Sequence, residues 1–103
     1  MSRKKRETKM LNPQKKQMIK LVQVDFDEGS GHYHLREIVV NSLHIVSMVY
    51  DDYHAALHAN GRLPEGLHEA QQFSKIMLTN GKEIIAVGSP DTINLKAKKI
   101  LHG

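Results

Sequence analysis

Seven histidines in 103 residues are the most prominent side chains with the chemistry of a site. His54 and His58 are four residues apart, a spacing that places both imidazole rings on one face of a helix. His68 could join them across a loop and form a zinc site, which needs three or four fixed ligands. The carboxylates that could complete it are Asp51, Asp52, Glu65 and Glu69. No HExxH pattern or cysteine pair accompanies them, so we predict no metal ligands and expect exposed or singly hydrogen-bonded histidines, with a pH-dependent contact as an alternative.

Nucleophilic catalysis has few candidate residues in this chain. Cysteine is absent, and no serine has the strand–turn–helix context of an activated nucleophile. The serines in predicted turns, strands or a cap are Ser30, Ser42, Ser47, Ser74 and Ser89. The carboxylates Asp25, Asp27 and Glu28 border a glycine-containing turn, where acids are usually solvated. The sequence predicts a protein that is not an enzyme and holds no cofactor.

Positive charge is concentrated at the N-terminus. Residues 1–20 hold eight Lys or Arg and one Glu, a net charge of +7, whereas the other 83 residues hold seven basic and ten acidic side chains, a net charge of −3. Clustered cations can neutralise phosphates and give salt-sensitive affinity that is largely independent of base sequence. The residues predicted to contact DNA or RNA are Arg3, Lys4, Lys5, Arg6, Lys9, Lys15 and Lys16. A partner-protein anchor or a solvated tail are the alternatives.

The chain divides into an arm and one small domain. Residues 1–17 are polar, contain the breaker Asn12-Pro13 and show no apolar period, so we expect a disordered basic arm. Residues 18–103 suffice for a single β-rich domain with a modest core. No apolar segment follows the N-terminal charges, and no run reaches the roughly 18 apolar residues of a membrane helix. We expect a cytoplasmic protein, of a bacterial cell or a phage-infected host, with no membrane contact.

Five segments alternate between apolar and polar residues as strands do. They lie at about 18–26, 32–40, 44–50, 73–79 and 83–87. Asn80-Gly81 predicts a type I′ hairpin between the last two. Ser89 before Pro90 predicts the cap of a terminal helix, which Ile93 and Ala97 would anchor. The predicted fold is mainly β (β+α): a small antiparallel five-stranded barrel or curled sheet with one C-terminal helix.

The 22 residues at 51–72 separate the third predicted strand from the fourth. Asp51 or Asp52 could cap a short helix that ends at Asn60-Gly61, and the rest is typical of a loop or a further helical turn. Connections longer than 20 residues are usually functional or mobile in so small a domain. The predicted protein- or ligand-binding residues are Tyr50, Tyr53, His54, Leu57, His58, Arg62 and Leu67. The alternative is that the apolar residues plug an open end of the barrel.

Three segments together carry a family resemblance. Glu37–Ser47 places an asparagine between two strands, Ile76–Ile84 holds the hairpin Thr-Asn-Gly-Lys-Glu, and Val87–Ile93 holds a serine before a short helix. With their surroundings, 18–50 and 73–101, they resemble the FlbD-like small proteins of bacterial flagellar operons, which have similar proteins in phages. The basic arm and the inserted 51–72 depart from that pattern. The resemblance implies a small, non-enzymatic, regulatory protein and names no ligand.

These features predict a regulatory or accessory binding protein of phage or bacterial type. Its body would dock on a protein assembly, and its arm would contact nucleic acid. One alternative is an oligomeric small-ligand-binding or sequestering inhibitor that uses the loop at 51–72, and another is a metal-dependent enzyme. The sequence leaves the oligomeric state open, a homo-oligomer included.

Overall fold

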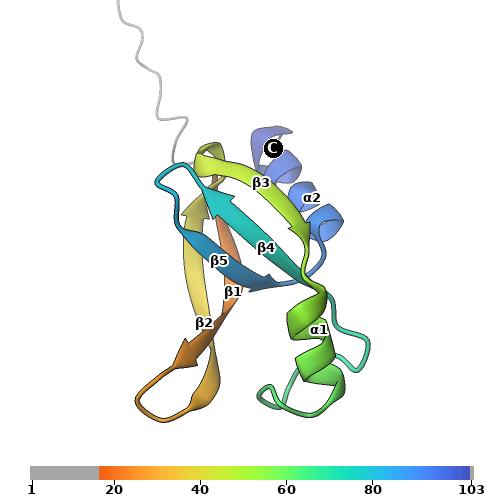
Figure 1. Ribbon diagram of the computed structural model, residues 1–103. Helices are drawn as coiled ribbons and strands as arrows, with labels where there is room; N and C mark the ends of the chain where they lie inside the picture. Colours follow the sequence, from red (N-terminus) through yellow and green to blue (C-terminus); the bar gives the residue numbers. More distant parts are fainter. Residues whose placement is uncertain (1–16, 103) are drawn as a thin grey trace, which may run out of the picture.

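The computed structural model describes residues 17–102, so the basic residues predicted to contact nucleic acid, Arg3 to Lys16, lie outside it. Five strands form one antiparallel sheet in the order β2-β1-β5-β4-β3 (Figure 1). The strands are β1 (Met18–Asp27), β2 (His32–Asn41), β3 (Ile45–Tyr50), β4 (Phe73–Leu78) and β5 (Glu83–Val87). A 3-10 helix, η3 (Ser42–His44), joins β2 to β3, and the α-helices are α1 (Asp52–Ala59) and α2 (Pro90–His102). The mainly β prediction is confirmed, with a curled sheet that stays open between its edges β2 and β3.

The β1–β2 hairpin is the longest paired unit of the sheet. Its register runs without a break from Met18 opposite Asn41 to Asp27 opposite His32. Gly31, at a φ of 76°, closes the turn by donating its N–H to the Asp27 carbonyl at 2.8 Å. A side chain disfavours this positive φ, so glycine is needed where the chain reverses.

The β4–β5 hairpin is confirmed, but the predicted type I′ turn is wrong. Leu78 donates its N–H to Lys82 and accepts one from Gly81, which leaves a loop of three residues, Thr79 to Gly81. Gly81 has a φ of 85°, and the Asn80 side chain accepts the Lys82 N–H at 2.9 Å. Three-residue loops with a glycine at positive φ also match the twist of the strands, so Asn-Gly alone does not distinguish them from type I′.

Two apolar clusters lie on opposite faces of the sheet. Neighbouring residues of a strand point to opposite faces, and β4 buries both Phe73 and Ile76, at 1% and 0% exposure. On one face, α2 covers a cluster made of Ile19, Leu21, Ile76, Ala86 and Ile93. On the other, α1 and the loop after it cover Val24, Leu63 and Phe73. The segment at 51–72 is therefore needed to close the second core.

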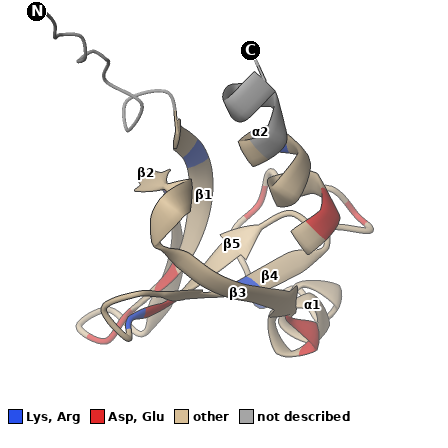
Figure 2. Ribbon diagram, turned by 90° about the horizontal axis from the view of Figure 1, so that it is seen from above, with Lys and Arg blue, Asp and Glu red and all other residues tan. Residues whose placement is uncertain are grey.

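Two predicted caps hold the ends of the helices. Asp51 accepts the Tyr53 N–H at the start of α1, and Ser89 accepts the Thr92 N–H at the start of α2. Each satisfies an N–H group that the first turn of a helix leaves without a partner. Lys and Arg are scattered over the described body and form no basic face (Figure 2). None of the described helices is long and apolar enough to cross a membrane.

Candidate functional site

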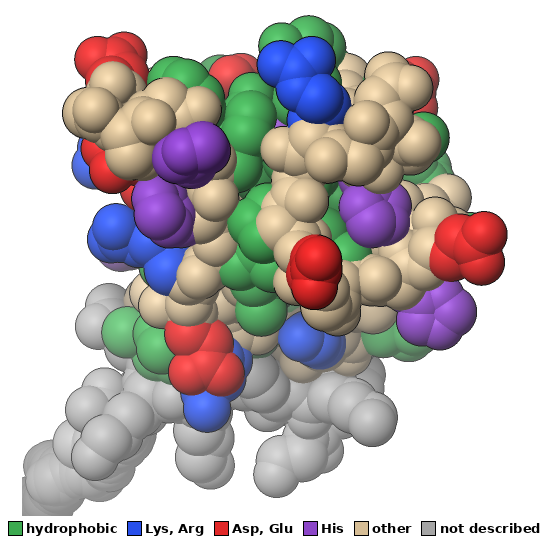
Figure 3. Space-filling view, turned by 90° about the horizontal axis from the view of Figure 1, so that it is seen from below, with side chains coloured by type: hydrophobic (Ala, Val, Ile, Leu, Met, Phe, Trp, Pro, Cys, Tyr) green, Lys and Arg blue, Asp and Glu red, His purple; other side chains and the backbone are tan. Residues whose placement is uncertain are grey.

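A groove lies between the β1–β2 hairpin and the segment formed by α1 and the loop after it. Its volume is about 570 Å³. The hairpin contributes Phe26, Gly31, His32 and Tyr33, and the other wall contributes Tyr53, Leu57 and Arg62. Hydrophobic side chains gather in the hollow between the two walls, and histidine and charged side chains flank them (Figure 3). The groove brings together residues that are about 20 to 35 positions apart in the sequence.

Aromatic rings make up much of the lining of this groove. Phe26 and Tyr33 are opposite each other in the hairpin, with ring centroids 4.9 Å apart and an interplanar angle of 60°. Tyr33 and Tyr53 both meet the His54 ring edge to face, at 5.9 and 5.1 Å. Phe26 is nevertheless 47% exposed and Tyr53 64% exposed. These rings thus keep free surface for a ligand while their contacts fix their positions.

A buried carboxylate holds the His54 ring that contacts the tyrosines of the groove. Asp51 has a side chain only 3% exposed, and its Oδ2 lies 2.5 Å from Nδ1 of His54. Its Oδ1 accepts the Tyr53 N–H at 3.2 Å. Both oxygens therefore have partners, as a buried carboxylate requires. The pair fixes the His54 ring, which both tyrosines contact.

Tyr33 and Arg62 set the electrostatics of the groove. Burial raises the pKa of Tyr33, the neighbouring Tyr53 hydroxyl adds to the rise, and the charge of Arg62 offsets part of it. Both hydroxyls can donate or accept hydrogen bonds. Among residues 17–102, Arg62 has no carboxylate partner. The groove thus presents one cation beside neutral aromatic rings.

The imidazole of His58 has structural partners. His58 Nε2 lies 2.6 Å from the His68 carbonyl, and its ring meets Phe73 at 6.0 Å. Leu67 packs against the apolar cluster that contains Phe73. His58 and Leu67 therefore support the wall of the groove from behind and do not line it. No group of three or more His, Cys, Asp or Glu side chains within the described range could hold a metal ion.

Tyr50 lies away from the groove, although we grouped it with these residues. Its hydroxyl donates to Asp91 at the start of α2, at 3.2 Å, and the charge of Asp91 raises the Tyr50 pKa. The adjacent Asp51 turns the chain from β3 into α1, which directs Tyr50 and Tyr53 to different surfaces. The residues predicted to bind a protein or ligand therefore fall into three groups. Tyr53, Leu57 and Arg62 line the groove, His54, His58 and Leu67 support it, and Tyr50 lies apart on β3.

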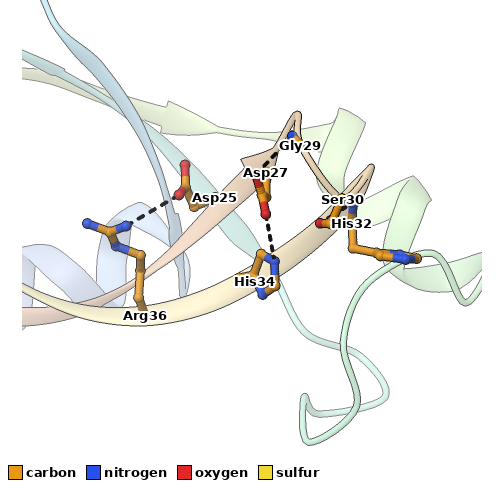
Figure 4. A network of polar contacts seen from close by, with 7 residues as sticks. All are labelled: Asp25, Asp27, Gly29, Ser30, His32, His34 and Arg36. Atoms are coloured by element: carbon orange, nitrogen blue, oxygen red, sulfur yellow. Dashed lines mark hydrogen bonds and ion pairs between the residues drawn. The ribbon is translucent and has the colours of Figure 1, made fainter.

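The carboxylates near the hairpin turn form an exposed polar network (Figure 4). Arg36 lies 3.5 Å from Asp25, and His34 lies 3.7 Å from Asp27. The Gly29 N–H donates to Asp27 at 3.0 Å, and this bond is the largest cause of the lowered pKa of Asp27. These contacts give the carboxylates local structural roles at the tip of the hairpin.

Four residues that line the groove were missed in the sequence: Phe26, Gly31, His32 and Tyr33. A signal for the aromatic pair was present. A hairpin that closes on the turn after Asp27 places the preceding Phe26 across from Tyr33, and cross-strand aromatic pairs are common. No local pattern indicated that α1 would pack beside this end of the hairpin.

Comparisons of this chain with protein-family models, with curated proteins and with solved structures gave no match. The groove and the charge of the N-terminal residues are therefore the two features that point to a function.

Proposed function

We propose that this chain is a non-enzymatic regulatory or accessory binding protein, of phage or bacterial type. Its groove would dock on a protein assembly by holding a peptide segment of the partner, and its basic N-terminal residues would contact nucleic acid. The observation that carries the proposal is the groove itself, with partly exposed Phe26 and Tyr53 beside Arg62. Tyr and Arg dominate the binding energy of protein interfaces, and exposed aromatic rings cost little entropy to immobilise.

The chemistry of the groove indicates what that segment would carry. An apolar or aromatic anchor fits between the rings of Phe26, Tyr33 and Tyr53, which leave an apolar floor at Leu57. A carboxylate next to the anchor would pair with Arg62, whose guanidinium binds carboxylates in a bidentate manner. We thus expect a peptide with an apolar residue beside an acidic one.

A non-enzymatic role agrees with the contacts of the reactive side chains. Asp51 and His54 have the composition of an acid–base pair, but the carboxylate also caps α1. Ser74 donates its hydroxyl to the Gly88 carbonyl at 2.7 Å, and Ser89 caps α2. These groups have structural roles. The resemblance to FlbD-like regulatory proteins favours the same conclusion.

A peptide-library selection tests the groove. The wild-type protein should enrich peptides that combine an apolar anchor with an acidic residue. The Arg62→Glu variant should instead enrich peptides with a basic residue at that position. Lys82→Glu makes the same charge change in the β4–β5 turn, outside the groove, and should leave the enriched motif unchanged. An enriched motif that is identical for wild type and both variants would remove the groove from the proposal.

The nucleic-acid half of the proposal has its own test. Replacing Arg3, Lys4, Lys5 and Arg6 by Gln should make the slope of log affinity against log salt for a DNA duplex shallower by about 3.6, since each of the four phosphate contacts contributes about 0.9. The control replaces four body lysines by Gln, with the same loss of charge. They are Lys20, Lys75, Lys82 and Lys96. Equal effects of the two variants would show that net charge, and not the N-terminal cluster, binds the duplex.

The groove volume also lies in the range of small-molecule sites, roughly 300–1,000 Å³, so a small-ligand-binding protein is the second candidate. A screen of aromatic carboxylates by thermal shift distinguishes the two. Stabilisation that Tyr53→Ala abolishes, with no peptide enriched, would favour the second candidate.

A further inference from the structure

β3 is an edge strand with one free side. In the order β2-β1-β5-β4-β3 it is the last strand, and within residues 17–102 it pairs with β4 alone (Figure 1). Among the described residues, no strand pairs with its other edge. A free edge presents a row of unpaired N–H and C=O groups, which can pair with a further strand.

The two edges of this sheet differ in how they are protected. β2 carries Arg36 and Glu37 along its length, and charged side chains on an edge discourage pairing with another chain. The stretch Ser42–Tyr50 contains no Lys, Arg, Asp or Glu. Its side chains Val46 and Val49 are 62% and 52% exposed. The edge of β3 is thus uncharged and rich in β-branched residues, no strand of residues 17–102 pairs with it, and its register with β4 shifts between Ile45 and Ser47.

A groove runs beside this edge, between β3 and α2, with a volume of about 410 Å³. Its apolar walls include Ile45 and Met48 from β3 and Ile93 and Ala97 from α2. A strand that pairs with β3 would direct alternate side chains toward this groove, because successive residues of a strand point to opposite faces. The groove therefore offers a place for the side chains of an added strand.

We propose that the free edge of β3 pairs with β3 of a second copy of this chain, antiparallel and about a twofold axis. The match in charge favours this occupant, since Ser42–Tyr50 brings no Lys, Arg, Asp or Glu to the pair, and Asp91, which lines the adjoining groove, already accepts a hydrogen bond from Tyr50. Pairing of β3 with β2 would instead desolvate Arg36 or Glu37. It would also repeat head to tail and need not close, whereas twofold pairing consumes both free β3 edges.

The pair should be modest in strength. A six-residue strand spans about 20 Å, and strand pairing plus the adjoining groove walls should bury about 1,000 Å², near the lower limit of specific interfaces. We therefore expect a dimer that dissociates on dilution. This inference is independent of the aromatic groove and of nucleic-acid binding.

The full chain tests the proposal by sedimentation over a range of concentrations. The wild type should shift between monomer and dimer, and Val49→Lys should weaken the dimer by about tenfold or more, because like charges meet across the axis. Val39→Lys is the control, since Val39 is also exposed, at 59%, but lies on β2. A wild type that remains a monomer throughout would overturn the proposal, as would assembly beyond a dimer or an equal loss in Val39→Lys.

Single cysteines locate the axis. The chain has no cysteine, so each variant forms a disulfide only with its own copy. Directly opposed residues of an antiparallel pair have Cα atoms about 4.5–5.5 Å apart, within the range that a disulfide spans. Among Val46→Cys, Ser47→Cys and Val49→Cys, we expect efficient cross-linking at the position nearest the axis only. Equal cross-linking at all three positions, or more efficient cross-linking of a Val39→Cys variant, would overturn the proposed pairing of β3.

Discussion

Replacing Asp51 by Ala should destabilise the protein far more than replacing its neighbour Asp52. Asp51 Oδ1 caps α1 through the Tyr53 N–H, and loss of such a cap costs about 1 kcal/mol. Oδ2 holds Nδ1 of His54, whose side chain is 14% exposed, and an unsatisfied buried nitrogen costs about 1–2 kcal/mol more. The free energy of unfolding should fall by about 2–3 kcal/mol. Asp51→Asn keeps one oxygen and should lie between wild type and Asp51→Ala.

Asp52 is exposed, and removing it changes the net charge by the same amount, so Asp52→Ala is the matched control. It should cost only the favourable interaction with the helix dipole, about 0.3–1 kcal/mol. Urea unfolding followed by circular dichroism measures both. With a slope of about 1 kcal/mol per molar urea, the midpoint of Asp51→Ala should fall by about 2–3 M. If the two variants agree within about 0.5 kcal/mol, the buried carboxylate does not hold α1 in place.

Three further predictions concern single contacts. Ser74→Ala removes the hydroxyl that donates to the Gly88 carbonyl and should lower the free energy of unfolding by about 1–2 kcal/mol, measured in urea. An unchanged free energy of unfolding would show that water replaces the hydroxyl. Asp91→Asn should lower the Tyr50 pKa toward its ordinary value of 10.0 in an ultraviolet titration, because the Asp91 charge raises it; an unchanged pKa would refute this contact. The lowered pKa of Asp27 means that its contribution to stability is complete above pH 3.8 and is lost as pH falls through the folded value, so Asp27→Asn should show a shallower acid-induced loss than wild type in pH-dependent unfolding.

Local patterns predicted the strands and the helix caps. Alternation identified the five strands to within one residue at most ends, and Ser89 and Asp51 were recognised as caps from their residue type and position. These features are local, because side-chain period and capping depend on a few neighbouring residues. The turn at Asn80-Gly81 shows the limit of this reasoning, because two loop geometries share the same dipeptide.

The groove depends on contacts that no local pattern contains. Phe26 and Tyr33 become neighbours through the hairpin register, but their approach to Tyr53 depends on how α1 packs on the sheet. The curl of the sheet sets that packing, and it results from the summed twist of five strands. The sequence could identify 51–72 as a region of interest without showing what would face it.

The structure reconciles the two alternatives for 51–72, a binding surface and an apolar plug. The sheet has two apolar faces, and α2 can cover only one of them, so the inner side of this segment must bury Phe73 through Leu63. That packing fixes the backbone, and the outer side then carries Tyr53 and Arg62 at the rim of the groove. Truncation of Leu63 should therefore unfold the domain, since it is 8% exposed, whereas truncation of the exposed Arg62 should change binding alone. A binding surface held in place by its own core needs no further ordering when a partner arrives.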